Sequence, residues 1–473
     1  MGLGGYWVVR VPGLMAVNDC PVCLVKQRRI DELEEEVKNL RAKVRYQERR
    51  EEDGFFGSST PSSKKPVKPN SEQRAKKPRG AKPGHRGVGR TSHADGTSDR
   101  AVDIKPEGET CPECGTPLEN KGWAERSVVD TPHQKAEKIT FRLAKRYCAH
   151  CRRNVTSQPP GVLPKSLYGN QFIADAVEMH YLHGMPMGRV CEYLDVGPGS
   201  LVKLFRRCAD LFGGVPDKLI EEYRQASVKH ADETGWRTDG KNGYVWLFAT
   251  RGLSIFQFGK SRSSKVPQIV FGKNPLPGTL VVDRYAAYNK APCQIQYCFA
   301  HLLRDVQDLE KEFPGEEEAS TFVAVVAPQL SLAIGLGRQP ISDEEFYRRA
   351  ATLREEIKTA MAQPARHQGV RRIQDIFREN EHRLFHWADN RAVPADNNLA
   401  ERDLRPSVIA RKVSFGSVTD AGAKIRSTLT TLAATIKKRG GNVAGQIKEA
   451  LDLLARNPDA DPYPILFALP NPP

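Results

Sequence analysis

Apolar and polar residues alternate along SVKHAD, a run that begins at Ser227 and ends in Asp232. A turn-rich segment, TDGKNG, follows, and a second strand-like run, YVWLFAT, occupies residues 244–250. Asp-Gly or Asn-Gly between two such runs is a strong local signal for a β-hairpin. A third run, TLVV, leads directly into Asp283. The pattern therefore predicts strands that each end in a carboxylate, although an acid at a strand end is usually a turn or cap residue.

The chain after Asp283 predicts a strand followed by many helices. Residues 293–306, CQIQYCFAHLLRDV, have the pattern of a strand that runs into a helix, and residues 305–394 look helical throughout. The segment DNNLAERDLRP has the character of a helix start and carries Glu401. Residues 424–441 have a helical period with a Gly stop, and a closing helix follows.

Residues 158–225 also predict helices. A helix, a short turn containing Gly, and a basic helix with Arg206 and Arg207 fit a helix-turn-helix. They fit a plain helical bundle with two surface arginines equally well. Near the N-terminus, a heptad seam predicts a short coiled coil or an amphipathic helix packed on its own domain. The apolar residues of that seam are Ile30, Leu33, Val37, Leu40 and Val44.

Length and charge bound the class of protein. A chain of 473 residues can hold several domains, and a net charge of +15 points to an acidic polymer such as nucleic acid. Ten Lys or Arg residues against one acid in residues 64–90 form a basic linker that can bind phosphates without sequence choice. We identify no signal peptide and no apolar stretch of the length of a membrane span, and we expect a cytoplasmic, nucleoid-associated protein of a bacterium.

The cysteines predict a structural zinc site. Two CxxC pairs, Cys111/Cys114 and Cys148/Cys151, offer four thiolates, which close a tetrahedral site with no open position. The segment between them, ITFRLAKRY (139–147), alternates like a strand. Cys20 and Cys23 form another CxxC with no second half nearby, which favours a lone pair of thiols.

The acids suggest phosphodiester chemistry. Two Mg²⁺ ions neutralise charge on the attacking and leaving oxygens, and hard cations take oxygen ligands, so a few carboxylates suffice. Spacing alone does not single out Asp232, Asp283 and Glu401 among 57 acids. Three histidines, His180, His183 and His230, have no partner at a metal spacing and suit packing or surface positions. Cys293, Cys298 and His301 lack a fourth ligand, so we expect His301 to border the catalytic site or to fix its helix.

Several long motifs in order resemble the insertion-sequence sixty-six family of DDE transposases (TnpC type). They include KPGHRG in the linker, the paired CxxC knuckles, HADETGW, VVDRYAAY, CFAHLLRD and DNNLAERDLRPSVIARK, within residues 54–440. The resemblance implies a ribonuclease-H-like core with Asp232, Asp283 and Glu401 as catalytic acids that hold two Mg²⁺ or Mn²⁺ ions. It also implies zinc at Cys111, Cys114, Cys148 and Cys151. Glu233 and Asp403 lie beside matched acids and are candidates for supporting or surface roles. The C-terminal VAGQIKEALDLLARNPDADPYPILF departs from the family pattern.

We therefore predict a multidomain α/β protein: a ribonuclease-H-like core with a helical insertion, preceded by a short coiled coil, a basic linker, a zinc ribbon and a helix-turn-helix-like DNA-binding region. The function implied is metal-dependent cleavage and strand transfer of an insertion sequence; the alternative is a catalytically silent or co-opted DNA-binding relative. Expected partners are DNA (element ends and target), further copies of the chain and small companion proteins, with no membrane. The predicted segments are 1–29 (N-terminal), 30–52 (coiled coil), 53–108 (linker), 109–157 (zinc), 158–225 (helical DNA-binding), 226–304 (first part of the core), 305–394 (insertion), 395–440 (second part of the core) and 441–473 (C-terminal helix and tail).

Overall fold

The computed structural model describes residues 158–467 continuously, together with 136–143, 145–148, 153–156, Pro117 and part of 25–44. The linker, Cys20 and Cys23, and most of the expected zinc region lie outside the described residues. Within the N-terminal segment all five seam residues are helical and exposed, so the expected helix is present. Whether the seam pairs with a second copy stays a prediction.

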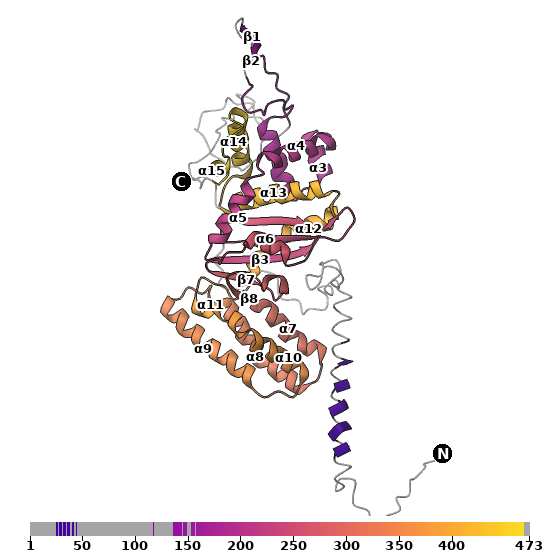
Figure 1. The fold of residues 1–473 in the computed structure, drawn as a ribbon, viewed down its shortest axis with the longest axis vertical. Coiled ribbons are helices and arrows are strands. Elements are labelled where there is room, and N and C mark those ends of the chain that lie inside the picture. The colour runs from indigo at the N-terminus through magenta and orange to yellow at the C-terminus, as the bar shows by residue number, and fades with distance from the viewer. Residues whose placement is uncertain are drawn as a thin grey trace, which may run out of the picture. The chain divides into compact units, whose positions relative to one another are not determined.

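The centre of the body is a five-stranded mixed sheet of order β6-β5-β3-β7-β8 (Figure 1). Strand β3 (Val228–Gly235) pairs antiparallel with β5 (Tyr244–Ala249), which pairs antiparallel with β6 (Ser254–Gly259). On its other side β3 pairs in parallel with β7 (Thr279–Val282), and β7 pairs in parallel with β8 (Gln294–Tyr297). Numbered by chain order, the strands therefore run 3-2-1-4-5 across the sheet. This arrangement bears out the predicted mixed α/β class.

The predicted hairpin forms, with one difference in its first strand. Its turn lies at Asp239–Gly240, both at positive φ, between Thr238 and Lys241, which exchange backbone hydrogen bonds of 3.0 Å. Strand β3, however, continues beyond Asp232 as far as Gly235 because β5 pairs with it along its whole second half. Asp232 is thus inside the strand and not at its end, whereas Asp283 directly follows β7 as expected.

Two long helices of the C-terminal part cover the sheet. Helix α12 (Asn398–Ser414) packs on β3 and β5, and α13 (Asp420–Lys438) lies along the edge strand β6 (Figure 1). Threonines of α13 bond to the free backbone of that edge: Thr435 Oγ1 accepts from the Ser254 N–H at 3.2 Å, and Thr431 Oγ1 accepts from the Phe256 N–H at 2.9 Å. An unpaired sheet edge invites pairing with other chains, and α13 closes it.

Helices α2 (Asn170–Val177), α3 (Met187–Leu194), α4 (Pro198–Leu211) and α5 (Val215–Gln225) form the predicted helical region. A π-helical turn, η4 (Glu178–Leu182), extends α2. Their buried side chains belong to the same hydrophobic core as the sheet, and α4 packs on α13. On α4 the Arg206 side chain is exposed, whereas Arg207 donates to the Pro164 carbonyl at 2.7 Å. The helix-turn-helix interpretation stays a prediction.

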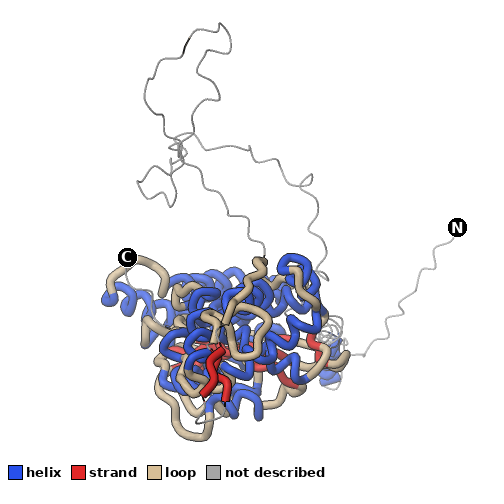
Figure 2. Tube along the Cα trace, turned by 90° about the horizontal axis from the view of Figure 1, so that it is seen from above, coloured by secondary structure: helices blue, strands red, loops and turns tan. Residues whose placement is uncertain are grey.

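The expected insertion, residues 305–394, consists of helices joined by loops. It begins inside α7 (Phe299–Glu312) and continues with α8 (Glu317–Leu336), α9 (Asp343–Ala362), α10 (Gln368–Asn380), η6 (Glu381–Arg383) and α11 (His386–Asp389). Contrary to our expectation, α8 has the length and composition of a membrane span, with 20 residues and a mean hydropathy of 1.7 in its apolar stretch. Its buried residues pack among α7, α9 and α10, as in the core helix of a bundle. Figure 2 shows helices packed around the strands of the body.

The C-terminal elements close the fold as predicted. Helix α13 ends at Lys438, with Gly440 at a φ of +78° just beyond it, and α14 (Val443–Arg456) and α15 (Tyr463–Leu466) follow. Short connections remain elsewhere: α6 (Lys265–Phe271), η5 (Ala286–Tyr288), and β4 (Arg237–Thr238), which pairs in parallel with β9 (Gly416–Ser417).

Part of the expected zinc region forms a separate antiparallel hairpin. Strand β1 (Lys145–Cys148) pairs with β2 (Arg153–Thr156), and Cys148, the first residue of the second CxxC pair, is the last residue of β1. The strand expected over 139–147 begins only at Lys145, since residues 139–143 are not in a strand. The four thiols lie outside what the structure describes, and zinc stays a prediction.

Candidate functional site

Asp232 and Asp283 are brought together by the parallel pairing of β3 and β7. His230 pairs with Val281, and Asp232 and Asp283 each lie two residues further on. The two acids therefore lie at equivalent positions on neighbouring parallel segments. Local backbone bonds orient both carboxylates. Asp232 Oδ1 accepts from the Glu233 N–H at 2.8 Å, and Asp283 Oδ1 accepts from the Tyr285 N–H at 2.9 Å. Both of these bonds use Oδ1, and the structure gives no hydrogen bond to either Oδ2 among the described residues.

Asn397, just before α12, positions Glu401. Its Nδ2 donates to the Ala231 carbonyl at 2.8 Å, next to Asp232 in β3, and its Oδ1 lies 2.9 Å from His230 Nδ1. Its backbone N–H donates to Cys298 Sγ at 3.1 Å. Glu401 lies in the first turn of α12, and the far end of that helix is tied to β3 by Arg411, which donates to the Gly235 carbonyl at 2.6 Å. Helix α12 is thus fastened to β3 near both ends.

Asp232 lies within electrostatic range of the other two acids. Burial raises the pKa of this carboxyl well above its usual value, and Glu233, Asp283 and Glu401 raise it further. Like charges in one site disfavour ionisation unless a cation compensates for them. In addition, Glu401 Oε1 is buried and has no hydrogen-bond partner among the described residues. Crowded carboxylates and an unpaired buried oxygen fit a divalent cation, which takes oxygen ligands.

A histidine and a cysteine lie beside Glu401. One ligand atom from each of Cys298, His301 and Glu401 falls within 4.8 Å of the others. His301 Nδ1 is 3.9 Å from Glu401 Oε1, and His301 Nδ1 also has no hydrogen-bond partner among the described residues. His301 therefore lies beside Glu401, where it would border the catalytic site if Glu401 belongs to that site. Cys293 is not in this group, and Glu401 supplies the third donor that sequence spacing did not suggest.

Glu233, next to Asp232 in β3, has its carboxylate in a buried polar contact. Its Oε1 accepts from Arg262 Nε at 3.0 Å and Nη2 at 2.6 Å, and its Oε2 accepts from the Tyr288 hydroxyl at 2.5 Å. Burial raises the pKa of Glu233, as does Asp283, while Arg262 and Tyr288 lower it. The Arg262 guanidinium also lies over the Tyr285 ring, 4.1 Å from its centroid. Glu233 therefore supports the loop that follows Asp283.

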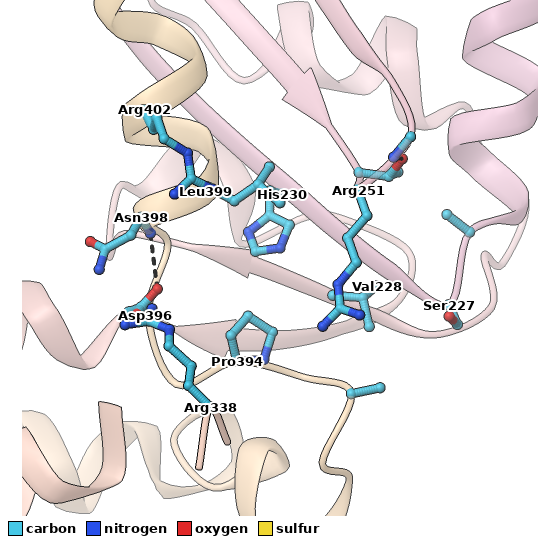
Figure 3. A pocket seen from close by; sticks show the side chains of 14 residues that line it. Ser227, Val228, His230, Arg251, Arg338, Pro394, Asp396, Asn398, Leu399 and Arg402 are labelled. Carbon is cyan, nitrogen blue, oxygen red and sulfur yellow. Dashed lines mark hydrogen bonds and ion pairs between the residues drawn. The ribbon is translucent and has the colours of Figure 1, made fainter. Parts of the chain in front are cut away.

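An arginine-lined pocket of about 690 Å³ lies where the insertion meets the sheet. Arg251 from the β5–β6 turn and Arg338 beyond α8 approach it from different sides, with Arg402 on α12 above (Figure 3). Arg338 is paired with the buried Asp396, whereas the structure gives Arg251 and Arg402 no ionic partner within the described chain. His230 lines the pocket too, two residues before Asp232 in β3.

The other residues singled out in the sequence, His180, His183 and Asp403, make contacts with protein groups outside the acidic site. His180 is buried, 2.8 Å from the Met185 carbonyl and 2.8 Å from Arg426 Nη2, and His183 is exposed near Glu178. Asp403, on α12, accepts from the Ser254 hydroxyl at 2.7 Å and is paired with Lys438 of α13. It therefore joins α12 to the sheet edge and α13. Sequence reasoning missed Asn397, whose only signal was its place in DNN before the helix.

Comparison with known proteins identifies the family of this chain. The model of the Transposase IS66 family matches residues 165–425, more than half of the chain. An uncharacterized protein, y4qI of Sinorhizobium fredii (strain NBRC 101917 / NGR234), is 23% identical over 345 residues, covering 63% of this chain and 62% of the relative. The chain thus spans about three fifths of that relative's length. The matched segment contains all three acids, and the family implies divalent metal use. The chain belongs to the IS66 family of transposases.

Proposed function

We propose that the protein is a Mg²⁺- or Mn²⁺-dependent DNA transposase that cleaves at the ends of its own element and joins them to target DNA. The observation that carries this proposal is the parallel pairing of β3 and β7, which brings Asp232 and Asp283 to neighbouring strands, with Glu401 of α12 near enough to raise the pKa of Asp232. The mixed sheet of order 3-2-1-4-5 is followed by the helical insertion and then by α12 with the last acid, and this order of elements supports a ribonuclease-H-like core. Membership of the transposase family supports the reaction class.

The chain's own residues would prepare the site in three ways. Asp232 and Asp283 are oriented by backbone N–H groups, and the start of the helix that carries Glu401 is held by the side-chain bonds of Asn397 to β3. The three carboxylates would therefore lose little conformational freedom when the substrate binds. The bound ions would activate the attacking hydroxyl and neutralise charge on the attacking and leaving oxygens. Arg262, whose side chain is 47% exposed while it holds Glu233, leaves a positive group beside the acids for the DNA backbone.

Basic surfaces would supply most of the affinity for DNA. Phosphate contacts by Lys and Arg give affinity without sequence choice, because they release condensed counterions. Arg251 and Arg402 at the pocket, the exposed Arg206 on α4, and the basic linker at 64–90 are the candidates. We also propose further copies of the chain and small companion proteins as partners, and a cytoplasmic, nucleoid-associated location.

A cleavage and strand-transfer assay tests the proposal. Labelled duplexes with the DNA that flanks the gene would be incubated with Mg²⁺ or Mn²⁺ and the full chain. We expect nicked and joined products from wild type and from the control Asp375→Asn, a half-exposed acid of the insertion that is paired with Arg378. Asp283→Ala and Glu401→Gln should bind the same DNA and give no product.

Two results would count against the proposal. Products from Asp283→Ala equal to those from wild type would remove that acid from the site. DNA binding without products from wild type, even with the products of the neighbouring genes added, would favour the catalytically silent DNA-binding protein instead.

A further inference from the structure

Two buried polar atoms face each other at the edge of the acidic site. His301 Nδ1 and Glu401 Oε1 are 3.9 Å apart, and neither has a hydrogen-bond partner among the described residues. Buried polar atoms are nearly always bonded, and 3.9 Å is too long for a hydrogen bond between them. Because metal bonds to imidazole nitrogen and to carboxylate oxygen are each about 2.0–2.2 Å long, one ion can contact both atoms.

From this pair we infer that His301 is a direct ligand of the divalent ion held by Glu401, and adds one nitrogen donor to the three carboxylates. The inference rests on the proposed function, because it assumes that the acids bind metal. It assigns to His301 a role that neither the sequence spacing nor the three acids required.

The position of His301 is fixed by the backbone that carries the acids. Helix α7 begins right after β8, and its first N–H, from Phe299, donates to the Ala395 carbonyl at 2.7 Å. The Cys298 N–H donates to the carbonyl of Val282, the residue before Asp283, at 2.8 Å. His301 is therefore tied both to the loop of Asp283 and to the start of α12.

Cys298 lies near His301 and Glu401, but its sulfur already accepts a hydrogen bond. Cys298 Sγ accepts the Asn397 N–H at 3.1 Å and is buried at the N-terminus of α7. It joins the chain segments that carry His301 and Glu401. The ligand pair is thus imidazole and carboxylate, without the thiolate that would favour a closed structural zinc site.

A nitrogen donor alters which metal is preferred. Mg²⁺ takes oxygen ligands almost entirely, whereas imidazole suits transition-metal ions. His301 should therefore add affinity for Mn²⁺ and little for Mg²⁺. Second-shell partners of metal ligands already change affinity by about 10–100-fold, so loss of a direct ligand should weaken Mn²⁺ binding by at least about 10-fold.

Pulsed electron paramagnetic resonance of Mn²⁺ bound to the full chain, without DNA, tests this inference. A directly bound imidazole nitrogen couples to the Mn²⁺ spin, and incorporation of ¹⁵N-histidine changes the coupling. We expect this coupling in wild type and in His183→Gln, a control at an exposed histidine. His301→Gln should lose the coupling and bind Mn²⁺ at least about 10-fold more weakly, with Mg²⁺ affinity changed much less.

Two outcomes separate the failure of this inference from that of the proposed function. If wild type binds Mn²⁺ without nitrogen coupling, and Asp232→Asn and Glu401→Gln no longer bind it, the role of His301 is overturned and the acidic site stands. Mn²⁺ affinity unchanged in both acid variants would overturn the acidic site itself. The wild-type ¹⁵N comparison decides the matter even if His301→Gln fails to fold.

Discussion

The closeness of β3 and β7 can be probed at Gly278, which lies just before β7. Gly278 has a φ of +72°, and a Cβ there would be 2.0 Å from the Ser227 carbonyl oxygen. The same carbonyl accepts the Thr279 N–H at 2.9 Å, which sets the parallel pairing. Gly278→Ala should therefore push β7 from β3 and separate Asp283 from Asp232.

Two costs add at this position. A non-Gly residue in the left-handed region costs about 1–2 kcal/mol. Overpacking against neighbours costs about 1–3 kcal/mol, and here the neighbour is backbone that cannot rotate away. The expected loss in the free energy of unfolding is therefore about 2–5 kcal/mol. Gly240→Ala is the matched control, because Gly240 has a φ of +67° with no atom within 4 Å of a built Cβ, and it should show the conformational cost alone.

Chemical unfolding of the full chain measures both variants, and Mn²⁺ titration gives a second result. Gly278→Ala should be less stable than Gly240→Ala by about 1–3 kcal/mol and should bind Mn²⁺ more weakly, while Gly240→Ala keeps wild-type affinity. Equal stability of the two variants, within about 0.5 kcal/mol, would refute the close approach of the two strands, because the steric contact would then be absent.

Three further predictions concern charge. Burial and Arg426 lower the pKa of His180 to about 4, so between about pH 6.5 and 4 the unfolded chain binds more protons than the folded one. The free energy of unfolding should therefore decrease as the pH is lowered through that window. Unfolding curves of His180→Gln should show a smaller decrease, and an equal decrease would contradict this. Arg262→Met leaves the buried Glu233 carboxylate without its cation and should destabilise the chain, by less than the about 3–5 kcal/mol of a fully buried pair because Arg262 is 47% exposed. Most of the loss should be recovered when Glu233→Gln is added, and a double variant as unstable as the single would contradict the pairing. Arg251→Ala and Arg402→Ala should each weaken DNA binding and lower the slope of log affinity against log salt by about 0.9, and unchanged slopes would exclude phosphate contacts there.

The sequence was informative where local pattern decides structure. Short β-branched runs and the Asp-Gly turn predicted β3, β5 and β7, and helical periods predicted the insertion and α13. The acids themselves were chosen by motif resemblance, because spacing left many alternatives. The helix carrying Glu401 was expected from its N-terminal sequence, and it begins at Asn398.

Contacts between distant segments could not be predicted in the same way. Asn397 meets His230 across 167 residues, and His301 meets Glu401 only because α7 and α12 start side by side. The sequence did not predict that the strand continues past Asp232, because Glu233 is polar; its burial is compensated by bonds from Arg262 and Tyr288. Side-chain pattern alone cannot show such partners.

Crystals of the full chain grown with Mn²⁺, with an anomalous difference map recorded near the manganese absorption edge, would test most directly whether the three acids form one metal site. We predict an anomalous peak within bonding distance of carboxylate oxygens from Asp232, Asp283 and Glu401. Manganese peaks elsewhere on the protein, with none between these acids, would contradict the account.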